Sequence, residues 1–289
     1  MFRLRLKFSK HGPIRFIGHL DVLRYFQKAI RRAGIDVAYS GGFSPRQQIG
    51  FAHPLSVGAT SDGEYMDMNI NSFKDIRLTA LSSTSDKYSG NKENLTASYN
   101  EYVSESELNE LIDRLNKVCN EGISISDAKL LSKSDKKAMA AVAACRWRVA
   151  FNKKIFDEED ISDDNLNEAF DGFMLKDNIT VKKEGKAGSQ EINIRPFVYE
   201  AKRYLNSEYE LLLKSGSEDN IKPGLFIGAF YKYIKDSDRD RFDDSKDPSE
   251  LEKSVYKLHR LETYLSGDDG RGVYIEPIIC RKKEDRLYI

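Results

Sequence analysis

The sequence of 289 residues has few of the residue types on which several protein classes depend. Its cysteines are only Cys119, Cys145 and Cys280, an odd number at wide spacing, which argues against a disulfide framework and is typical of reduced thiols in the cytosol. No apolar run reaches the roughly 18 residues that a membrane-spanning helix requires. We therefore expect a cytoplasmic protein that has no association with a membrane.

Motifs for metal and cofactor binding are also missing. No cysteines or histidines stand at the C-x-x-C or H-x-x-x-H spacing of a zinc site, and no cysteines are close enough in the sequence to hold an iron–sulfur cluster. The G-x-x-x-x-G-K-[ST] loop that binds nucleotide phosphates is absent. The sequence therefore predicts neither a metal nor a cofactor. We expect the acidic neighbours Glu64 and Asp67 to be solvated.

Charge is balanced over the whole chain but unevenly distributed. Lysine plus arginine and aspartate plus glutamate both number 46. Residues 1–58, however, contain ten basic residues and only two acidic ones, a surplus of eight positive charges that the rest of the chain balances. Such a surplus favours an anionic partner, of which structured nucleic acid is the commonest. The alternative is that a basic N-terminal unit packs against an acidic C-terminal unit of the same chain.

The first part of the chain has the pattern of a small α+β unit. Alternation predicts a strand at 2–9, helical spacing predicts a helix at 19–33 that ends at Gly34, and a capping box at Ser104 and Glu107 begins a second helix. Further segments are strands at 48–55 and 64–70 joined by a polar turn at 59–63, a polar loop at 82–102, and a strand from Ile123. The order strand, helix, strand, strand, helix, strand is that of the ferredoxin-like split βαβ arrangement.

The second part of the chain has a similar but less regular pattern. The segments that we expect are strands at 147–152, 209–214 and 255–264, helices at 166–174 and from Pro223 to about residue 234, a hairpin of 179–183 with 191–195, a charged loop at 236–250, and strand character at 273–275. The predicted fold class is therefore α+β, with two ferredoxin-like (βαββαβ) units that have antiparallel sheets. Residues 1–132 form the first unit, and residues 143–289 form an elaborated second unit with an extra strand and a C-terminal tail.

Several segments together resemble a known family. They are GPIRFIGHLD at 12–21, RRAG at 31–34, YSGGFSP at 39–45, FAHPLSVG at 51–58, IRPF at 194–197 and HRLETY at 259–264. They are similar to the radical SAM-linked protein family, a bacterial family without a settled function whose members are encoded beside, or fused to, a radical SAM enzyme. The resemblance implies a radical SAM enzyme as the partner. Family members often carry a histidine after the Phe-Asn/Ser-Pro turn, where this chain has Arg46, which suits an anion contact rather than a catalytic role.

The basic residues of the first unit are the candidate binding site for RNA or another anion. They are Lys10, Arg15, Arg24, Lys28, Arg31, Arg32 and Arg46. We expect them to surround one end of the unit, where phosphate contacts would supply affinity without reading sequence. The alternative is an ordinary solvated helix face. Nearby, Phe43 either offers a stacking surface for a base or, as we expect, belongs to the core.

His11 and His19 are the candidate catalytic residues, because they flank a Gly-Pro turn near Lys10. A histidine beside a lysine can act as general acid or base on an RNA 2′-hydroxyl without a metal. The nucleases that process CRISPR transcripts use duplicated ferredoxin-like domains in this way, which is an analogy of fold alone. The alternative is that His19 caps the helix and His11 is a surface turn residue.

Three functions remain open from the sequence. The first, which we favour, is a non-enzymatic accessory protein that presents structured RNA, such as transfer or ribosomal RNA, to a radical SAM enzyme. The second is a metal-independent endoribonuclease. The third is a scaffold that binds only the partner protein.

Overall fold

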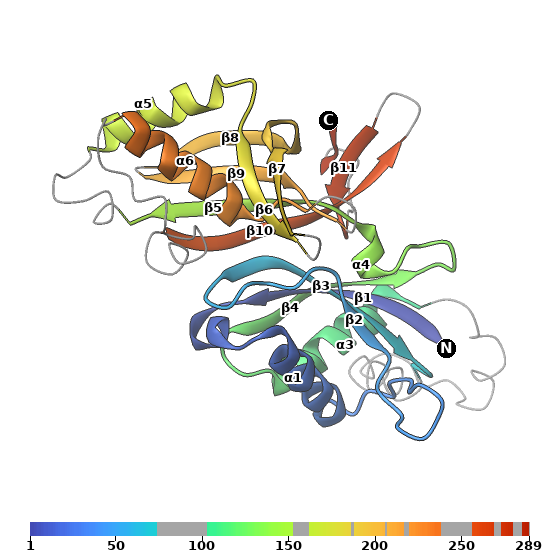
Figure 1. The fold of residues 1–289 in the computed structure, drawn as a ribbon. Coiled ribbons are helices and arrows are strands. Elements are labelled where there is room, and N and C mark those ends of the chain that lie inside the picture. The colour runs from blue at the N-terminus through green and yellow to red at the C-terminus, as the bar shows by residue number, and fades with distance from the viewer. Residues whose placement is uncertain are drawn as a thin grey trace, which may run out of the picture. The chain divides into compact units, whose positions relative to one another are not determined.

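The computed structural model describes residues 1–73, 103–152, 162–185, 188–205, 207–216, 220–237, 256–268, 273–279 and 285–288. The chain forms two compact units (Figure 1). Unit 1 consists of Met1–Ser56 and Gly63–Met139, and unit 2 consists of Val57–Asp62 and Ala140–Ile289. Within the described ranges, no helix is both long enough and apolar enough to cross a membrane.

The described residues of unit 1 form a small antiparallel sheet covered by two helices. Its elements are β1 (Phe2–Lys10), the 3-10 helix η1 (Gly12–Phe16), α1 (His19–Arg32), β2 (Ile49–Phe51), β3 (Thr60–Ile70), α3 (Glu105–Val118) and β4 (Ile123–Leu131), after which the chain enters the short α4 (Ala138–Ala141). The strand order is β4-β1-β3, with β2 paired to the outer side of β3. The pairs β1–β4 and β2–β3 are antiparallel. Helices α1 and α3 lie on one face of this sheet (Figure 1).

The core of unit 1 follows from two sequence periods. Period-two alternation in β1 places Leu4, Leu6 and Phe8 on the face that the helices cover, and all three are buried. Helical spacing in α1 brings Phe26 against them, and its ring meets that of Phe8 edge to face at 4.8 Å. Full burial of one such side chain contributes about 1.5–3 kcal/mol.

The ends of both helices in unit 1 confirm the sequence prediction. Gly34 follows α1 with φ of +65°, a backbone conformation that glycine adopts without the steric cost of a Cβ atom. At the start of α3, the Glu107 amide donates to Ser104 Oγ at 3.3 Å, while the Ser104 amide donates to Glu107 Oε2 at 2.7 Å. These reciprocal bonds form the predicted capping box.

The turn that we predicted at 59–63 is wrong. Residues 60–63 are the first residues of β3, and the turn lies earlier, at Gly58, whose φ is +94°. Thr60 and Ser61 belong to unit 2, where they pair in parallel with His259 and Arg260 of β10 (Tyr256–Asp268). This pairing joins residues 199 apart in the sequence, so the local pattern contains no sign of it. The predicted polar loop at 82–102 lies outside the described residues.

A short polar cluster fixes the start of β3 within unit 2. His259 Nδ1 lies 2.9 Å from Thr60 Oγ1, and His259 Nε2 lies 3.0 Å from Asp62 Oδ2. Ser61 Oγ, between them, donates to the carbonyl oxygen of Arg260 at 3.1 Å. The polar side chains of this strand start therefore have partners on β10, which is consistent with an extended backbone in a polar sequence.

Unit 2 contains a larger antiparallel sheet, two helices among its described residues and a separate hairpin. Its further elements are β5 (Val142–Phe151), α5 (Asp163–Met174), β6 (Thr180–Gly185), β7 (Gly188–Asn193), η4 (Arg195–Phe197), β8 (Val198–Leu205), β9 (Glu208–Lys214), α6 (Pro223–Ser237), β11 (Val273–Pro277) and β12 (Leu287–Tyr288). The strand order is β10-β5-β9-β8, β11 pairs with β10, β12 pairs with β11, and β6 and β7 form a separate hairpin. Figure 1 shows α5 and α6 together on one face of this sheet.

Aromatic side chains hold these two helices on the sheet. The ring of Phe170 in α5 lies 4.2 Å from that of Tyr209 in β9, and Phe230 in α6 lies 5.5 Å from Phe170.

The hairpin β6–β7 and the helices α5 and α6 confirm the predictions made for unit 2, whereas the strand β8 was missed. Most of the predicted charged loop at 236–250 lies outside the described residues. The predicted α+β class with mostly antiparallel sheets is confirmed.

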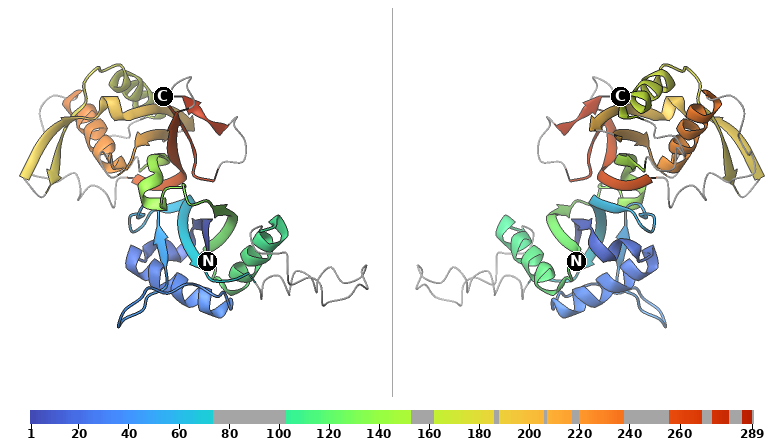
Figure 2. Two further views of the ribbon diagram at one scale, coloured as in Figure 1. Left: turned by 90° about the vertical axis from the view of Figure 1, so that its right-hand side faces the viewer. Right: turned by 90° about the vertical axis from the view of Figure 1, so that its left-hand side faces the viewer.

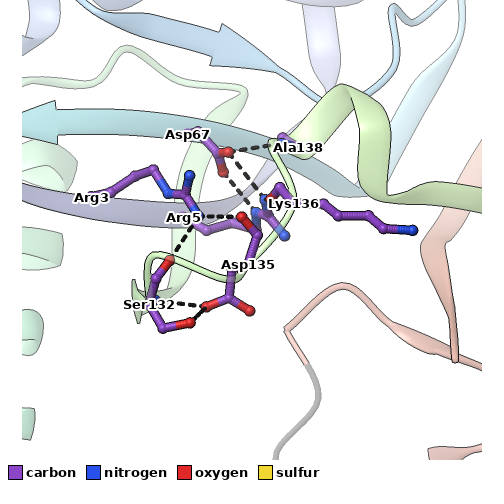
Figure 3. A network of polar contacts seen from close by, with 7 residues as sticks. All are labelled: Arg3, Arg5, Asp67, Ser132, Asp135, Lys136 and Ala138. Atoms are coloured by element: carbon purple, nitrogen blue, oxygen red, sulfur yellow. Dashed lines mark hydrogen bonds and ion pairs between the residues drawn. The ribbon is translucent and has the colours of Figure 1, made fainter.

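A buried ion pair joins β1 to β3 in unit 1 (Figure 3). The guanidinium of Arg5, which is 3% exposed, donates to both carboxylate oxygens of Asp67, at 2.6 and 3.0 Å. The same guanidinium donates to the carbonyl oxygen of Lys136 at 2.8 Å, and Asp67 also accepts a bond from the Ala138 amide at 2.7 Å. The expectation that Asp67 and Glu64 are solvated is therefore wrong, and Glu64 is also buried, at 6% exposure.

The chain between β4 and α4 is fixed by the same network. Arg3 Nη2 donates to the carbonyl oxygens of Ser132, at 2.9 Å, and of Asp135. The Ser132 amide and hydroxyl donate to the Asp135 carboxylate at 2.6 and 2.9 Å. Burial alone would raise the pKa of Asp135, but these bonds outweigh it and hold the pKa below its ordinary value.

Replacement of Asp67 tests how much the buried ion pair stabilises the fold. We expect Asp67→Ala to lower the free energy of unfolding by about 3–5 kcal/mol, because it leaves the Arg5 charge buried without its carboxylate. Urea denaturation measures this change. The matched control is Asp21→Ala, which breaks an exposed ion pair with Arg24 and is expected to cost less than about 1 kcal/mol. Equal losses in the two variants would contradict the assigned role of Asp67.

Candidate functional site

A groove lined by three arginines lies on the outer side of unit 1. It has a volume of about 460 Å³ and lies between α1 and the segment 39–47. Its polar lining consists of Arg24, Gln27 and Arg31 from α1 with Arg46 and Gln47 from the segment, and its apolar lining consists of Leu20, Leu23, Tyr39 and Pro45. We refer to this surface as the arginine groove.

The segment 39–47 is closed by its own hydrogen bonds. The Ser40 amide donates to the carbonyl oxygen of Arg46 at 2.8 Å, and the Arg46 amide donates to Ser40 Oγ at 3.0 Å. Between these residues, Gly42 has φ of +97°, which an L-residue with a side chain adopts only under strain. The loop is therefore tight, and Arg46 at its end lies beside Ser40 at its start.

Gln47 fixes the closed segment on α1. Its side chain is buried, and Nε2 lies 3.3 Å from the carbonyl oxygen of Gln27 and 3.3 Å from Tyr39 Oη, to both of which it donates. Because Gln27 lies between Arg24 and Arg31 on α1, this contact sets Arg46 opposite the arginines of the helix. The Gln47 amide thus helps to hold the two walls of the arginine groove together.

The three arginines give the groove a net positive charge. Arg24 and Arg31 are seven residues apart, two turns of helix, and therefore share one face. Arg24 Nη1 lies 3.0 Å from Asp21 Oδ1 in an exposed pair, and Arg31 Nε donates to the carbonyl oxygen of Gln27 at 3.2 Å. Arg46 has no ion-pair partner among the described residues. Planar guanidinium groups with free donors suit phosphate and carboxylate oxygens.

The other four predicted basic residues do not line the groove. Lys28 is exposed on α1, one turn after Arg24, and Arg15 is exposed on η1 with its guanidinium 4.6 Å from the centre of the Phe16 ring. Arg32 Nη2 donates to the carbonyl oxygen of Val118 at 2.9 Å and so joins α1 to the end of α3. Lys10 is only 2% exposed. The structure therefore brings three of the seven residues together.

Lys10 serves the fold. Its ammonium donates to the carbonyl oxygens of Ile17 at 2.9 Å and Arg15 at 3.4 Å, which end η1 and lead into α1. The sequence contains a sign of this burial, because Lys10 continues the even-numbered face of β1 that Leu4, Leu6 and Phe8 bury. Glu64 shows the same sign, since it shares its face of β3 with the buried Met66 and Met68.

A small cavity brings Lys10 together with one of the two predicted catalytic histidines. It is about 10 Å³ in volume, and its polar lining is Lys10, His19, His53 and Glu64. This volume accommodates about one water molecule and leaves no room for a ribose and its phosphate. His11 does not line it. His53 and Glu64 were missed as members of this cluster, and no sequence motif connects them.

The structure also shows the surroundings of His19 and of two cysteines. Gly18, and not His19, is the N-cap residue of α1, and the His19 ring packs edge-on against Phe51 at 5.3 Å. Cys145 is buried, and burial raises the pKa of the half-buried Cys119, so neither described thiol has the character of an activated nucleophile. In the part of the chain that the structure describes, no three His, Cys, Asp or Glu side chains are placed to hold a metal ion.

Phe43 lies at the tip of the segment that carries Arg46. The ring is completely exposed, with a relative exposure of 112%, so the expectation that it belongs to the core is wrong. Two further apolar side chains at the groove, Leu20 and Tyr39, are also exposed. Sequence reasoning missed Tyr39, although the glycines of the YSGGFSP segment already indicated a tight turn that keeps its tip away from the core.

The fold and the groove together define an α+β protein with a basic groove on its first unit. Residues 3–87 and 88–223 match the family described as an uncharacterized protein conserved in bacteria (DUF2344). These matches cover more than half of the chain, and the chain therefore belongs to that family. No curated protein matches the sequence. The expected membership of a bacterial family of unknown function is confirmed, and the description of that family names no partner.

The internal role of Lys10 is testable. We expect Lys10→Met to lower the free energy of unfolding by about 1–3 kcal/mol, because two buried carbonyl oxygens lose their donor. Urea denaturation measures the loss. Lys28→Met, at an exposed position of α1, is the control and is expected to change stability by no more than about 0.5 kcal/mol. If the two variants were equally stable, Lys10 would not be the structural donor described above.

Proposed function

We propose that the chain is a non-enzymatic accessory protein that binds structured RNA, such as transfer or ribosomal RNA, and presents it to a radical SAM enzyme in the cytoplasm. The observation that carries the RNA part is the arginine groove. Three guanidinium groups from two separate elements line it, and one exposed carboxylate, Asp21, lies beside them.

The chemistry of the groove favours phosphate as the ligand group. Each guanidinium offers donors in a planar fork that matches two oxygens of a phosphate, and the Gln27 amide of the lining adds a neutral donor and acceptor. A volume of about 460 Å³ holds more than one phosphate group, which suits a polymer backbone. Contacts of this kind give affinity without sequence recognition.

The two strand orders support a finer assignment of the fold. In unit 1 the order β4-β1-β3-β2, and in unit 2 the order β10-β5-β9-β8, both place the first strand beside the last and the third. Among the described residues, each unit has two long helices at equivalent points of the chain, α1 and α3 in unit 1 and α5 and α6 in unit 2. We infer a duplicated ferredoxin-like fold in which β6 and β7 are an insertion. This fold serves many functions, so the functional proposal rests on the groove and not on the fold.

The radical SAM partner is supported by the resemblance of the segments at 12–21, 39–45 and 51–58 to the radical SAM-linked family. The chain lacks the closely spaced cysteines that an iron–sulfur cluster requires. A division of labour is consistent with both facts, because the partner would hold the cluster and carry out the chemistry. This chain would hold the RNA.

Salt dependence tests the groove. We expect RNA binding in a filter-binding titration to weaken steeply with salt, and Arg31→Gln or Arg46→Gln each to reduce the slope of log affinity against log salt by about 1, because each removes one phosphate contact. Lys257→Gln, at an exposed position of β10 in unit 2, is the control and should leave the slope unchanged. Salt-insensitive binding, or no binding, would contradict the proposal.

Co-purification with the radical SAM enzyme that the family resemblance implies tests the proposed partner. We expect the two proteins to purify together with RNA, and RNase treatment to weaken the complex. A complex that RNase leaves unchanged would favour the protein-only scaffold.

Incubation with RNA in EDTA tests for nuclease activity. RNA incubated with the protein in EDTA should stay intact, since the cavity at Lys10 and His19 has no room for a nucleotide. Cleavage would favour the endoribonuclease.

A further inference from the structure

We propose that the arginine groove binds RNA at unpaired nucleotides, with one base stacked on the ring of Phe43. This inference rests on the proposed RNA binding and names the class of RNA, which is a loop, bulge or single strand rather than a continuous duplex. It follows from the exposure of Phe43, from the rigidity of the loop that carries it, and from the charges that surround it.

The exposure of Phe43 is enforced by the backbone. The hydrogen bonds between Ser40 and Arg46 close the base of the loop from both sides, and Gly42 at φ of +97° turns its tip. The connection between α1 and β2 projects away from the sheet (Figure 2), and the Phe43 ring that it carries is completely exposed. The whole Phe43 side chain therefore lies in solvent, on a loop that hydrogen bonds between Ser40 and Arg46 close.

The position of Phe43 relative to the phosphate-binding groups is set by the chain. Arg46 follows Phe43 by three positions, and three residue steps span at most about 11 Å even when fully extended. Pro45 and Arg46 both line the arginine groove. A base on the Phe43 ring therefore leaves its own backbone, or that of the next nucleotide, within reach of the guanidinium groups.

Charge distinguishes a nucleobase from an apolar protein surface as the occupant. A protein hot spot buries an aromatic anchor in a desolvated apolar patch. Phe43 instead shares its loop with Arg46, and Arg24 and Arg31 line the opposite wall of the groove. A basic groove next to exposed aromatic rings is the usual arrangement for unpaired nucleic acid, where bases stack on the rings and arginines follow the backbone.

A continuous duplex does not suit this arrangement. Its bases are stacked on one another, so no base face is available to the Phe43 ring unless a nucleotide is first unstacked. Duplex RNA still offers phosphates to Arg24, Arg31 and Arg46. Two contributions to the binding affinity can therefore be distinguished. The arginine charges attract any RNA, whereas the Phe43 ring stacks only on unpaired nucleotides.

The experiment compares two RNA probes by equilibrium binding of the full chain. The probes are oligouridylate and a perfectly paired RNA duplex with the same number of phosphates. We expect Phe43→Ala to weaken binding of oligouridylate about tenfold, as loss of one stacked base does, and to leave duplex binding unchanged. Phe43→Trp should retain oligouridylate binding. Arg46→Gln should weaken binding of both probes.

A matched control and a spectroscopic readout exclude a general surface effect. Leu175→Ala removes an apolar side chain that is 84% exposed in unit 2 and should change neither affinity. A fluorescent purine analogue placed in the single-stranded probe should lose emission when it stacks on the wild-type protein. It should keep its emission on the Phe43→Ala variant at saturating protein.

The outcomes separate the two proposals. If the wild-type chain binds neither RNA, the proposed function fails and this inference with it. If the wild-type chain binds RNA and Phe43→Ala binds both probes as well as the wild type does, only the stacking inference is overturned. An equal loss for both probes, or a loss confined to co-purification with the radical SAM enzyme, also overturns it, and the latter would make Phe43 a protein contact.

Discussion

The arginine groove depends on the burial of one side chain amide. Gln47 is the point at which the segment 39–47 is fixed to α1, through its bonds to the carbonyl oxygen of Gln27 and to Tyr39 Oη, both at 3.3 Å. A buried amide without these acceptors would cost free energy, so the loop is held in one place. The position of Arg46 opposite Arg24 and Arg31 follows from this anchor, as does the outward position of Phe43.

The basic residues of 1–58 have two different roles, and their number alone does not distinguish them. Arg3 and Arg5 organise the chain between β4 and α4, Lys10 satisfies the carbonyl oxygens that lead into α1, and Arg32 joins α1 to α3. These four side chains are committed to the protein itself. Of the other six, the three groove arginines, Lys28 and Arg15 are exposed and Lys7 is half-buried, so the surface available to an anion is smaller than the surplus implies.

Much of unit 1 was predictable because its signals are local. Alternation identified β1, helical spacing and Gly34 identified α1, and Ser104 with Glu107 identified the start of α3. The strand start at Thr60 was not predictable, since its partners are His259 and Arg260, far away in the sequence. In unit 2, β8 was missed for a different reason, because its burial has little alternation although its partner β9 follows it directly.

The sequence by itself determined the order of most elements in unit 1, the α+β class and the identity of the residues that carry positive charge. It also contains a sign that Lys10 and Glu64 lie on buried strand faces. Only the tertiary structure decided which charges face a ligand. A basic residue looks the same in a sequence whether its donors meet a carbonyl oxygen, as in Lys10 and Arg32, or remain at a groove, as in Arg46, because that depends on neighbours that the fold supplies.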